Sequence, residues 1–381
     1  LHRLIRRQRQ MCIRDRPDTD QELYFGRKEL QEDLKRIIER SFILGNPIKL
    51  VITGIFGSGK THTLYHLKYI LEKEYDSKVV LTEIGDVTKK TMFSTLHNNI
   101  LDILGLDEIS SLLRRFQQIE AQKNPEKNLD ANDLLKDILK SENISIAFAT
   151  LTLYGQHKNV AWKWLKGGNL SNQELAQIGI TSNLTESSDM VKILTFIAEL
   201  YNLVKNQKLV IMIDEAEKLN DVKEQEAIAN WSNANRLLAD QSNDSLSFIY
   251  AIAGRGEIDE LPEMFSRREF VDRIGSDNNI RLTTLNTDEI SEFLDDLLNT
   301  IVDKEKAINS LANETIKEED IKRYYPFTEE SYRFFIDDVL SRIRTFTPRL
   351  LVKILNTLAF EGFKSEKRFF DIELIQDAHF V

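Results

Sequence analysis

The stretch GIFGSGKTHTL, residues 54–64, indicates the fold of this chain more strongly than any other segment. It follows a short β-branched apolar run, residues 48–53, that is typical of a buried strand. After it, apolar residues recur at helical spacing from Leu64 to Leu71. The local order is therefore strand, glycine loop, helix.

Within this order, Gly54-x-x-x-x-Gly59-Lys60-Thr61 has the spacing of a phosphate-binding loop. Glycines let the backbone wrap around an anion, and the loop N–H groups and the helix N-terminus point at the phosphates. We expect Lys60 to reach the β- and γ-phosphates and Thr61 to ligate Mg²⁺. The alternative, an ordinary glycine-rich turn, is disfavoured because both flanks fit. The expected nucleotide contacts from this loop are Gly54, Gly57, Ser58, Gly59, Lys60, Thr61 and His62.

Composition excludes several classes of protein. With 381 residues and 41% hydrophobic residues, the chain can build one large core or two modest ones. Its longest uncharged apolar run, residues 246–254, is too short to span a bilayer, and no secretory signal is visible, so we expect a cytoplasmic protein without a membrane partner. The single cysteine, Cys12, excludes an intrachain disulfide, and the six histidines show no ligand spacing, so we predict no structural zinc.

The first sixteen residues, LHRLIRRQRQMCIRDR, differ from the rest of the chain. They contain six arginines and one acidic residue, and MCIRDR resembles translated sequencing-adaptor sequence, so we treat residues 1–16 as non-native. The alternative is a basic arm for nucleic acid. Without this segment the net charge changes from −10 to −15, because 45 basic and 60 acidic residues remain. Such an acidic protein needs a local basic patch to contact DNA.

A second phosphate-site motif lies in QKLVIMIDEAEKL, residues 207–219. Five apolar residues, typical of a strand buried on both faces, end in Asp214 and Glu215. Open α/β sheets place ligands at the carboxyl ends of their strands. We therefore expect Asp214 to order Mg²⁺ and Glu215 to polarise the attacking water, as in a Walker B motif. The alternative is an acidic strand end that only starts the next helix.

The remaining pattern predicts an α/β fold, a three-layer αβα sandwich with a five-stranded parallel sheet, a helical insertion and a C-terminal helical lid. Three further strands are predicted within residues 78–86, 245–254 and 278–285. The predicted core is 17–285, the insertion is about 105–190, and the lid is 286–381. In the lid, we expect Thr287, Thr328 and Thr347 to be N-cap residues. Pro348 is expected at the first helical position after Thr347, which places Arg349 at a helix start.

This order of motifs resembles the AAA+ ATPases, and within them the origin-recognition and initiator-like group. The resemblance covers about residues 22–375, and it implies ATP and Mg²⁺ as ligands and assembly with further copies of the chain. It implies that Arg349, in Thr347-Pro348-Arg349, is the sensor 2 arginine, and that Phe25 in FGRKEL borders the adenine. It also implies an arginine finger before the fifth strand, for which EMFSRREFVDRI offers Arg267 or Arg268, with Arg273 in reserve. The bland alternative is that these arginines are solvated or paired with nearby acids.

A narrower resemblance is to the ATP-binding proteins of bacteriophage-exclusion (BREX-type) defence systems. It rests on GIFGSGKTH, on IMIDEAEKL and on WKWLKGGNLS, residues 162–171. The last stretch interleaves two tryptophans with lysines. It is either a stacking surface for nucleic acid or, as we favour, an amphipathic helix with its aromatic residues in the core.

One departure from the AAA+ pattern bears on the rate of hydrolysis. The fourth strand of the family usually ends in a polar sensor 1 residue, whereas this one ends in Ala253-Gly254-Arg255. An arginine there resembles the signalling STAND NTPases. The sequence therefore supports two functions from different classes. The first is an AAA+ ATPase that hydrolyses ATP at a subunit interface to remodel or load DNA or a DNA-bound protein complex. The alternative is a STAND-like regulatory switch that hydrolyses ATP slowly, and a third, weaker possibility is a structural subunit held together by nucleotide.

Overall fold

The computed structural model describes residues 21–123, 131–153, 155–241, 244–254, 261–311, 318–339, 343 and 346–378. The adaptor-like residues 1–16 and Arg255 lie outside the described residues. Packing divides the chain into two compact units. One contains the described residues up to Leu34, the loop segment Ile55–His66 and the residues from Leu282 onward, and we call it the loop–lid unit. The other, the sheet unit, contains Lys35–Gly54 and Leu67–Arg281.

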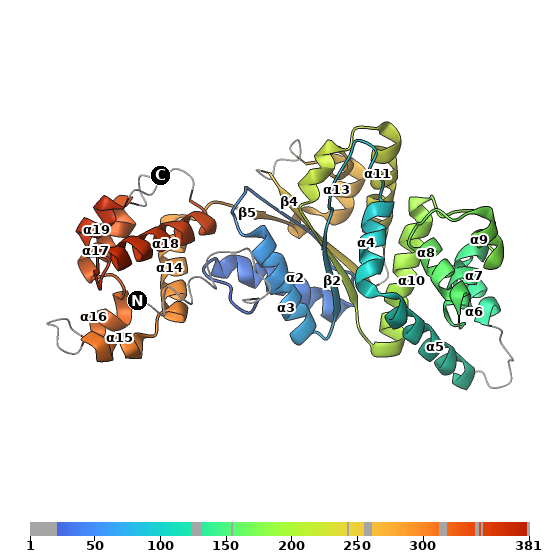
Figure 1. Cartoon of the computed structure of the whole chain (residues 1–381), viewed down its shortest axis with the longest axis horizontal. Helices are drawn as coiled ribbons and strands as arrows, with labels where there is room; N and C mark the ends of the chain where they lie inside the picture. The colour runs from blue at the N-terminus through green and yellow to red at the C-terminus, as the bar shows by residue number, and fades with distance from the viewer. Residues whose placement is uncertain are drawn as a thin grey trace. The chain divides into compact units, whose positions relative to one another are not determined.

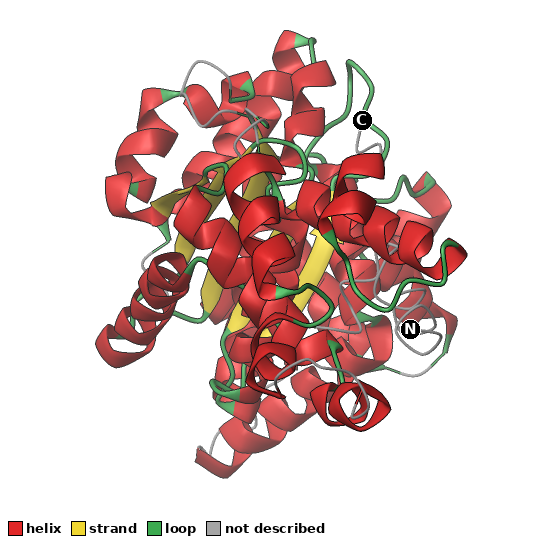
Figure 2. Cartoon of the chain, turned by 90° about the vertical axis from the view of Figure 1, so that its left-hand side faces the viewer, coloured by secondary structure: helices red, strands yellow, loops and turns green. Residues whose placement is uncertain are grey.

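The strands that the structure describes form one five-stranded sheet in the order β2-β3-β4-β1-β5, which confirms the predicted fold class (Figures 1 and 2). The β2–β3, β3–β4 and β1–β4 ladders are parallel. The register places Gly54 opposite Ala253 and Glu83 opposite Asp214, so the strands end together at one edge. The strands are β1 (Lys49–Gly54), β2 (Lys78–Glu83), β3 (Leu209–Asp214), β4 (Leu246–Ala253) and β5 (Asn279–Leu282).

The central strands are apolar because helices cover both of their faces. All eight residues of β4 are buried, and so are the first five of β3. Continuous apolar runs of this kind are the signature of parallel strands without a solvent-facing side. Figure 1 shows α2 (Lys28–Leu44) and α3 (Lys60–Lys73) on one side of the strands, with α4 (Ser94–Leu104) and α10 (Ser187–Lys205) on the other.

The predicted insertion is helical, and its core is continuous with that of the sheet. Trp164 is buried and its Nε1 donates a hydrogen bond to the Ser182 carbonyl at 2.8 Å. Lys163, on the same helix, instead forms an exposed ion pair with Glu174. This arrangement agrees with the amphipathic helix that we favoured over a stacking surface. The insertion contains α5 (Leu106–Lys123), α6 (Ala131–Leu139), α7 (Glu142–Leu151), α8 (Gln156–Leu165) and α9 (Asn172–Gln177).

Beyond the insertion and α10, the described residues of the sheet unit also form helices and 3-10 turns between and after the strands. Those elements are η1 (Ala216–Asp221), α11 (Gln225–Asp240), α12 (Glu263–Ser266), α13 (Arg268–Ile274) and η3 (Ser276–Asn278). Nowhere in the described ranges is there a helix with the length and apolar character needed to cross a membrane.

The lid helices surround a second hydrophobic core, and their N-caps agree with the sequence at two of three positions. Thr328 and Thr347 cap their helices as predicted. Thr287 was wrongly predicted: the cap is Asn286, whose side chain accepts a hydrogen bond from the Glu289 N–H in a capping box. Asparagine is at least as good a cap as threonine, so the helix starts one residue earlier. The elements are α14 (Thr287–Ile301), α15 (Lys304–Leu311), α16 (Glu318–Tyr324), α17 (Glu329–Phe334), the π-helix η4 (Phe335–Val339), α18 (Pro348–Lys364) and α19 (Ile372–Asp377).

One buried histidine gives the sheet unit a testable pH dependence. His97 of α4 is fully buried and its Nε2–H donates to the Leu165 carbonyl at 2.8 Å, which ties α4 to the insertion. Burial lowers the pKa of His97 to about 4, because the charged ring would be desolvated. In the unfolded chain His97 therefore binds a proton near pH 6.5, whereas in the folded chain it stays neutral at that pH. The stability that neutral His97 contributes above pH 6.5 is lost as the pH falls toward 4.

We expect His97→Gln, which keeps a donor for Leu165, to remove this part of the pH dependence. Between pH 7 and pH 5 the wild-type free energy of unfolding should fall by about 2 kcal/mol more than that of the variant. Urea unfolding at the two pH values measures the difference. Equal losses in the two proteins would show that His97 does not titrate as its burial implies.

Candidate functional site

The glycine loop has the backbone that its sequence requires. Gly57 has φ +80° and Gly59 has φ +100°, a left-handed region that strongly favours glycine. The Ser58 N–H donates to the Ile55 carbonyl at 3.2 Å, which closes the turn before α3 begins at Lys60. The loop therefore presents its backbone amides at a helix N-terminus, as an anion-binding loop does.

The loop residues also fit a phosphate ligand chemically. Ser58 Oγ is buried and has no hydrogen-bond partner among the described residues. No heavy atom of the described residues lies within 4 Å of the position that a Cβ would take at Gly59, so a ligand can approach the backbone there. Lys60 Nζ lies 3.2 Å from the Ile55 carbonyl, which keeps the ammonium at the loop, and Thr61 is exposed. A cation, backbone amides and hydroxyls are the donors and ligands that Mg-nucleotide needs.

The start of α18 lies directly against this loop, within the loop–lid unit. Thr347 caps α18 through its Oγ1, which accepts a hydrogen bond from the Leu350 N–H at 3.3 Å. A Cβ placed on Gly57 would lie 3.3 Å from both the Arg349 Cβ and the Thr347 Oγ1. The structure thus brings Arg349, the predicted sensor 2 residue, beside the phosphate loop. Its role there stays a prediction.

A short N-terminal segment, Gln21–Arg27, contacts the first turns of α3. Tyr24 OH forms a hydrogen bond with Thr63 Oγ1 at 2.8 Å, and its ring stacks on His62 with centroids 5.6 Å apart. The His62 Nε2–H donates to the Leu23 carbonyl at 2.6 Å. His62, which we expected to contact nucleotide, therefore holds this segment on the helix.

The same segment contacts the lid helix α14. Phe25 packs edge-on against Phe293 with ring centroids 5.9 Å apart, so the residue expected to border the adenine has a lid partner. The Gly26 N–H donates to Asp296 Oδ2 at 3.2 Å. Arg27 is buried and donates to the Thr283 carbonyl at 2.5 Å, and burial lowers its pKa. Tyr24 to Arg27 thus join the phosphate helix to the lid.

The acidic pair of the sheet unit has an unusual backbone. β3 ends at Asp214, whose Oδ1 accepts a hydrogen bond from the Glu215 N–H at 2.8 Å. Glu215 has φ +54° and ψ +34°, a left-handed conformation that costs a non-glycine residue about 1 kcal/mol or more. The strand end is therefore a strained turn that sets the direction of both carboxylates.

Two neighbours of this pair were not anticipated from the sequence. Lys218 Nζ forms an ion pair with Glu215 and lies 3.5 Å from Glu83 Oε2, at the end of β2. The hydrogen bond from Lys218 holds the pKa of Glu215 below its usual range. The i,i+3 spacing of Glu215 and Lys218 is visible in the sequence, but Glu83 joins them only through the β2–β3 register.

The end of β4 has an acidic neighbour in place of a polar side chain of its own. Glu217 Oε2 accepts a hydrogen bond from the Ala253 N–H at 2.7 Å. A carboxylate thus lies at the strand end where the family pattern has a sensor 1 residue. No sequence pattern indicates this contact, since Glu217 and Ala253 are 36 residues apart. Among the described residues, no group of three or more His, Cys, Asp or Glu side chains could hold a metal ion.

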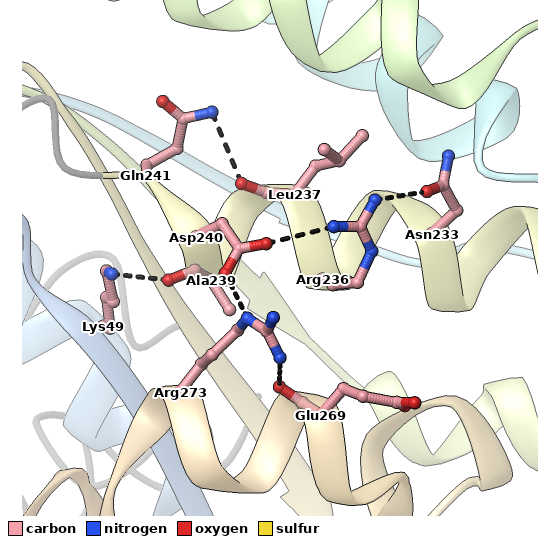
Figure 3. Close-up of polar contacts among 9 residues, drawn as sticks. All are labelled: Lys49, Asn233, Arg236, Leu237, Ala239, Asp240, Gln241, Glu269 and Arg273. Atoms are coloured by element: carbon pink, nitrogen blue, oxygen red, sulfur yellow. Dashed lines mark hydrogen bonds and ion pairs between the residues drawn. The ribbon is translucent and has the colours of Figure 1, made fainter.

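The three candidate finger arginines differ in their surroundings. Arg273 bonds to the Glu269 carbonyl and to Asp240, an acid that also binds Arg236 (Figure 3). Arg273 therefore ties α13 to the end of α11. Arg267 pairs with Glu263 at 3.1 Å, whereas Arg268 has a side chain that is 92% exposed and a 3.3 Å contact with Asp272. Of these three, Arg268 is the side chain most accessible to another molecule.

Comparison with known proteins finds similar structures only. No protein-family model matches the chain, and no curated protein matches it. The Walker-type ATPase of Pyrococcus abyssi has 13% identity and a TM-score of 0.39, with 91% of this chain and 69% of that chain covered. The Aeropyrum pernix ORC1 protein, solved in complex with DNA, has 10% identity and a TM-score of 0.44, with 94% and 65% covered. Domain III of the Thermotoga maritima replication initiation protein DnaA has 12% identity and a TM-score of 0.39, with 95% and 97% covered. The narrower resemblance to phage-exclusion proteins has no support in these comparisons.

We expect Gly57→Ala to weaken nucleotide binding by displacing Arg349 and Thr347, since the new Cβ would lie 3.3 Å from both side chains. Gly275→Ala is the matched control, because Gly275 also has φ +80° but no heavy atom of the part of the chain that the structure describes within 4 Å of its Cβ position. Both variants should lose about 1 kcal/mol of stability from backbone strain. Titration with a fluorescent ATP analogue should show weaker binding in Gly57→Ala alone. Equal affinity in the two variants would contradict a role for the α18 contact.

We expect Arg273→Ala to lower the stability of the chain and Arg268→Ala to lower its ATP turnover. Removing Arg273 should lower the free energy of unfolding by about 1 kcal/mol, because its ion pair with Asp240 is partly shielded. Removing Arg268 should leave stability unchanged and, if it is the finger, lower ATP turnover by about 10³-fold. Denaturation and ATPase assays on both variants test this. Full turnover in Arg268→Ala would leave Arg267 as the candidate.

Proposed function

We propose that this chain is an ATPase that binds Mg-ATP on its glycine loop and hydrolyses it. The observation that carries the proposal is the loop itself, with left-handed Gly57 and Gly59 around a buried Ser58 hydroxyl that has no hydrogen-bond partner among the described residues. Lys60 at the helix start and Arg349 beside Gly57 add two cations that suit a polyphosphate. This combination favours a nucleoside triphosphate over a single small anion.

The chain's residues take the following roles in the proposal. Thr61 and Asp214 are the Mg²⁺ ligands, and the bound ion would neutralise negative charge on the β- and γ-phosphates. Glu215 accepts the proton of the water that attacks the γ-phosphorus, while the bond to the β–γ bridging oxygen breaks and ADP leaves. The strained turn at Glu215 supports this assignment, because strained backbone is concentrated at reacting groups.

The proposed function also requires several copies of the chain to assemble. Arg268, exposed on α13, or its neighbour Arg267 would reach the nucleotide of another copy of the chain. The work done with ATP would be the remodelling or loading of DNA or of a DNA-associated protein complex. That part rests on the resemblance of the sequence to initiator-like ATPases, as does any role in phage defence.

The alternative function, a slowly hydrolysing regulatory switch, is favoured by one contact. Lys218 is ion-paired with Glu215, and a carboxylate engaged in this way is a poor proton acceptor. A chain that binds ATP tightly but keeps its general base in an ion pair would respond to nucleotide by a movement of its lid rather than by rapid turnover. Arg255, which first suggested this alternative, lies outside the described residues.

We expect Lys60→Ala to abolish ATP binding or turnover and Glu215→Gln to keep ATP binding while turnover falls by at least about 10²-fold. Lys68→Ala is the control, because Lys68 lies two turns further along the same helix and pairs with Glu72. ATP affinity and phosphate release are measured on all three. Normal turnover in Lys60→Ala would refute the assignment of the loop.

A further inference from the structure

Phe56, the third residue of the glycine loop, is an aromatic side chain that the proposed function does not use. It is 78% exposed, and neither hydrophobic core of the described residues includes it. A ring that buries so little apolar area contributes little to the stability of the fold. The presence of an aromatic residue at this place in the loop therefore calls for a reason other than packing.

The face of the Phe56 ring lies against the ammonium group of Lys60. Lys60 Nζ is 5.6 Å from the ring centroid, within the distance of about 6 Å at which a ring face attracts a cation. Lys60 is only 8% exposed, so its ammonium is shielded from most of the solvent. Shielding strengthens the attraction between the ring and the charge, because less water competes for the cation.

The hydrogen bond that Lys60 makes within the loop is a long one. The Ile55 carbonyl accepts from Lys60 Nζ and from the Ser58 N–H, each at 3.2 Å, which is the long end of the usual range. One carbonyl shared by two donors holds the ammonium loosely. The ring, in contrast, attracts the positive charge without requiring any particular N–H, so it keeps the ammonium at the loop and still lets it turn toward a ligand.

We propose that Phe56 is a positioning residue, whose ring holds the Lys60 ammonium over the glycine loop, ready for the phosphates of ATP. This inference rests on the proposed function, in which Lys60 contacts the β- and γ-phosphates. Phe56 acts through Lys60 and takes no part in the reaction itself. By restricting the ammonium before the nucleotide binds, the ring reduces the entropy that Lys60 loses on binding.

Substitutions at Phe56 should change ATP affinity according to the ring face and not according to size. Phe56→Leu keeps an apolar side chain but removes the ring, and should weaken Mg-ATP binding by about fourfold. Phe56→Trp should bind at least as well as the wild type, since indole offers the best face for a cation. Phe360→Leu is the control, because Phe360 is also well exposed, at 62%, but lies on α18 outside the glycine loop. Its ATP affinity should equal that of the wild type.

The most specific test replaces Phe56 by phenylalanines that carry one, two or three fluorine atoms on the ring. Each fluorine withdraws electron density from the ring face, while the side chain keeps its shape and becomes no more polar. The logarithm of the Mg-ATP affinity, measured by calorimetry on the full chain, should therefore fall stepwise with the number of fluorine atoms. A role of Phe56 in packing alone would leave the affinity constant along this series.

An affinity that does not depend on fluorine number would overturn the inference, as would equal losses of affinity in Phe56→Leu and Phe56→Trp, or in Phe56→Leu and Phe360→Leu. Failure of the proposed function looks different, because the wild type would then bind Mg-ATP no better than Lys60→Ala. Urea unfolding of Phe56→Leu should match that of the wild type. A lower stability in this variant would indicate that the ring supports the loop itself, and would also overturn the inference.

Discussion

The close approach of Gly57 to the start of α18 is the constraint on which the candidate site depends most. A Cβ on Gly57 would be in tight contact, at 3.3 Å, with the Thr347 hydroxyl oxygen and the Arg349 Cβ, and the φ of +80° at Gly57 also favours glycine. Thr347 must also cap α18, which fixes the direction in which Arg349 leaves the helix. A glycine in the loop, a cap and a proline at the first helical position thus place a cation beside the glycine loop, and the Tyr24–Arg27 segment joins α3 to the lid helix α14.

The sheet unit supplies acidic groups at the edge where its strands end. The parallel register brings Glu83 opposite Asp214, and the left-handed turn at Glu215 follows at once. Three carboxylates so close together would repel one another, and Lys218 offsets this charge between Glu215 and Glu83. Lys218 also makes Glu215 a weaker base. The ion pair that reduces the repulsion among the carboxylates would therefore also slow the ATP hydrolysis in which Glu215 would be the base. The two proposed functions, an ATPase that hydrolyses ATP rapidly and a switch that hydrolyses it slowly, therefore differ in how strongly Lys218 holds Glu215.

Sequence patterns predicted the fold well where local chemistry decides it. The glycine loop, the apolar strands, the helical lid and the Thr347 cap follow from residue type and spacing, and the structure has them. The cap at Asn286 was missed because two adjacent residues are both good caps, and only the geometry of the capping box selects one. Contacts between distant segments, such as Glu217 with Ala253 and Arg273 with Asp240, depend on sheet register and helix packing, which a single sequence does not determine.

The proposed function depends on binding and hydrolysis of ATP on the loop from Gly54 to Thr61. The most direct test is the specific rate of ATP hydrolysis by the full chain, measured with Mg²⁺ over a wide range of protein concentration. We predict turnover that depends on Mg²⁺ and rises with protein concentration, because in the proposed function an arginine from another copy would complete each site. Turnover that does not exceed the Lys60→Ala background at any concentration would contradict the claim.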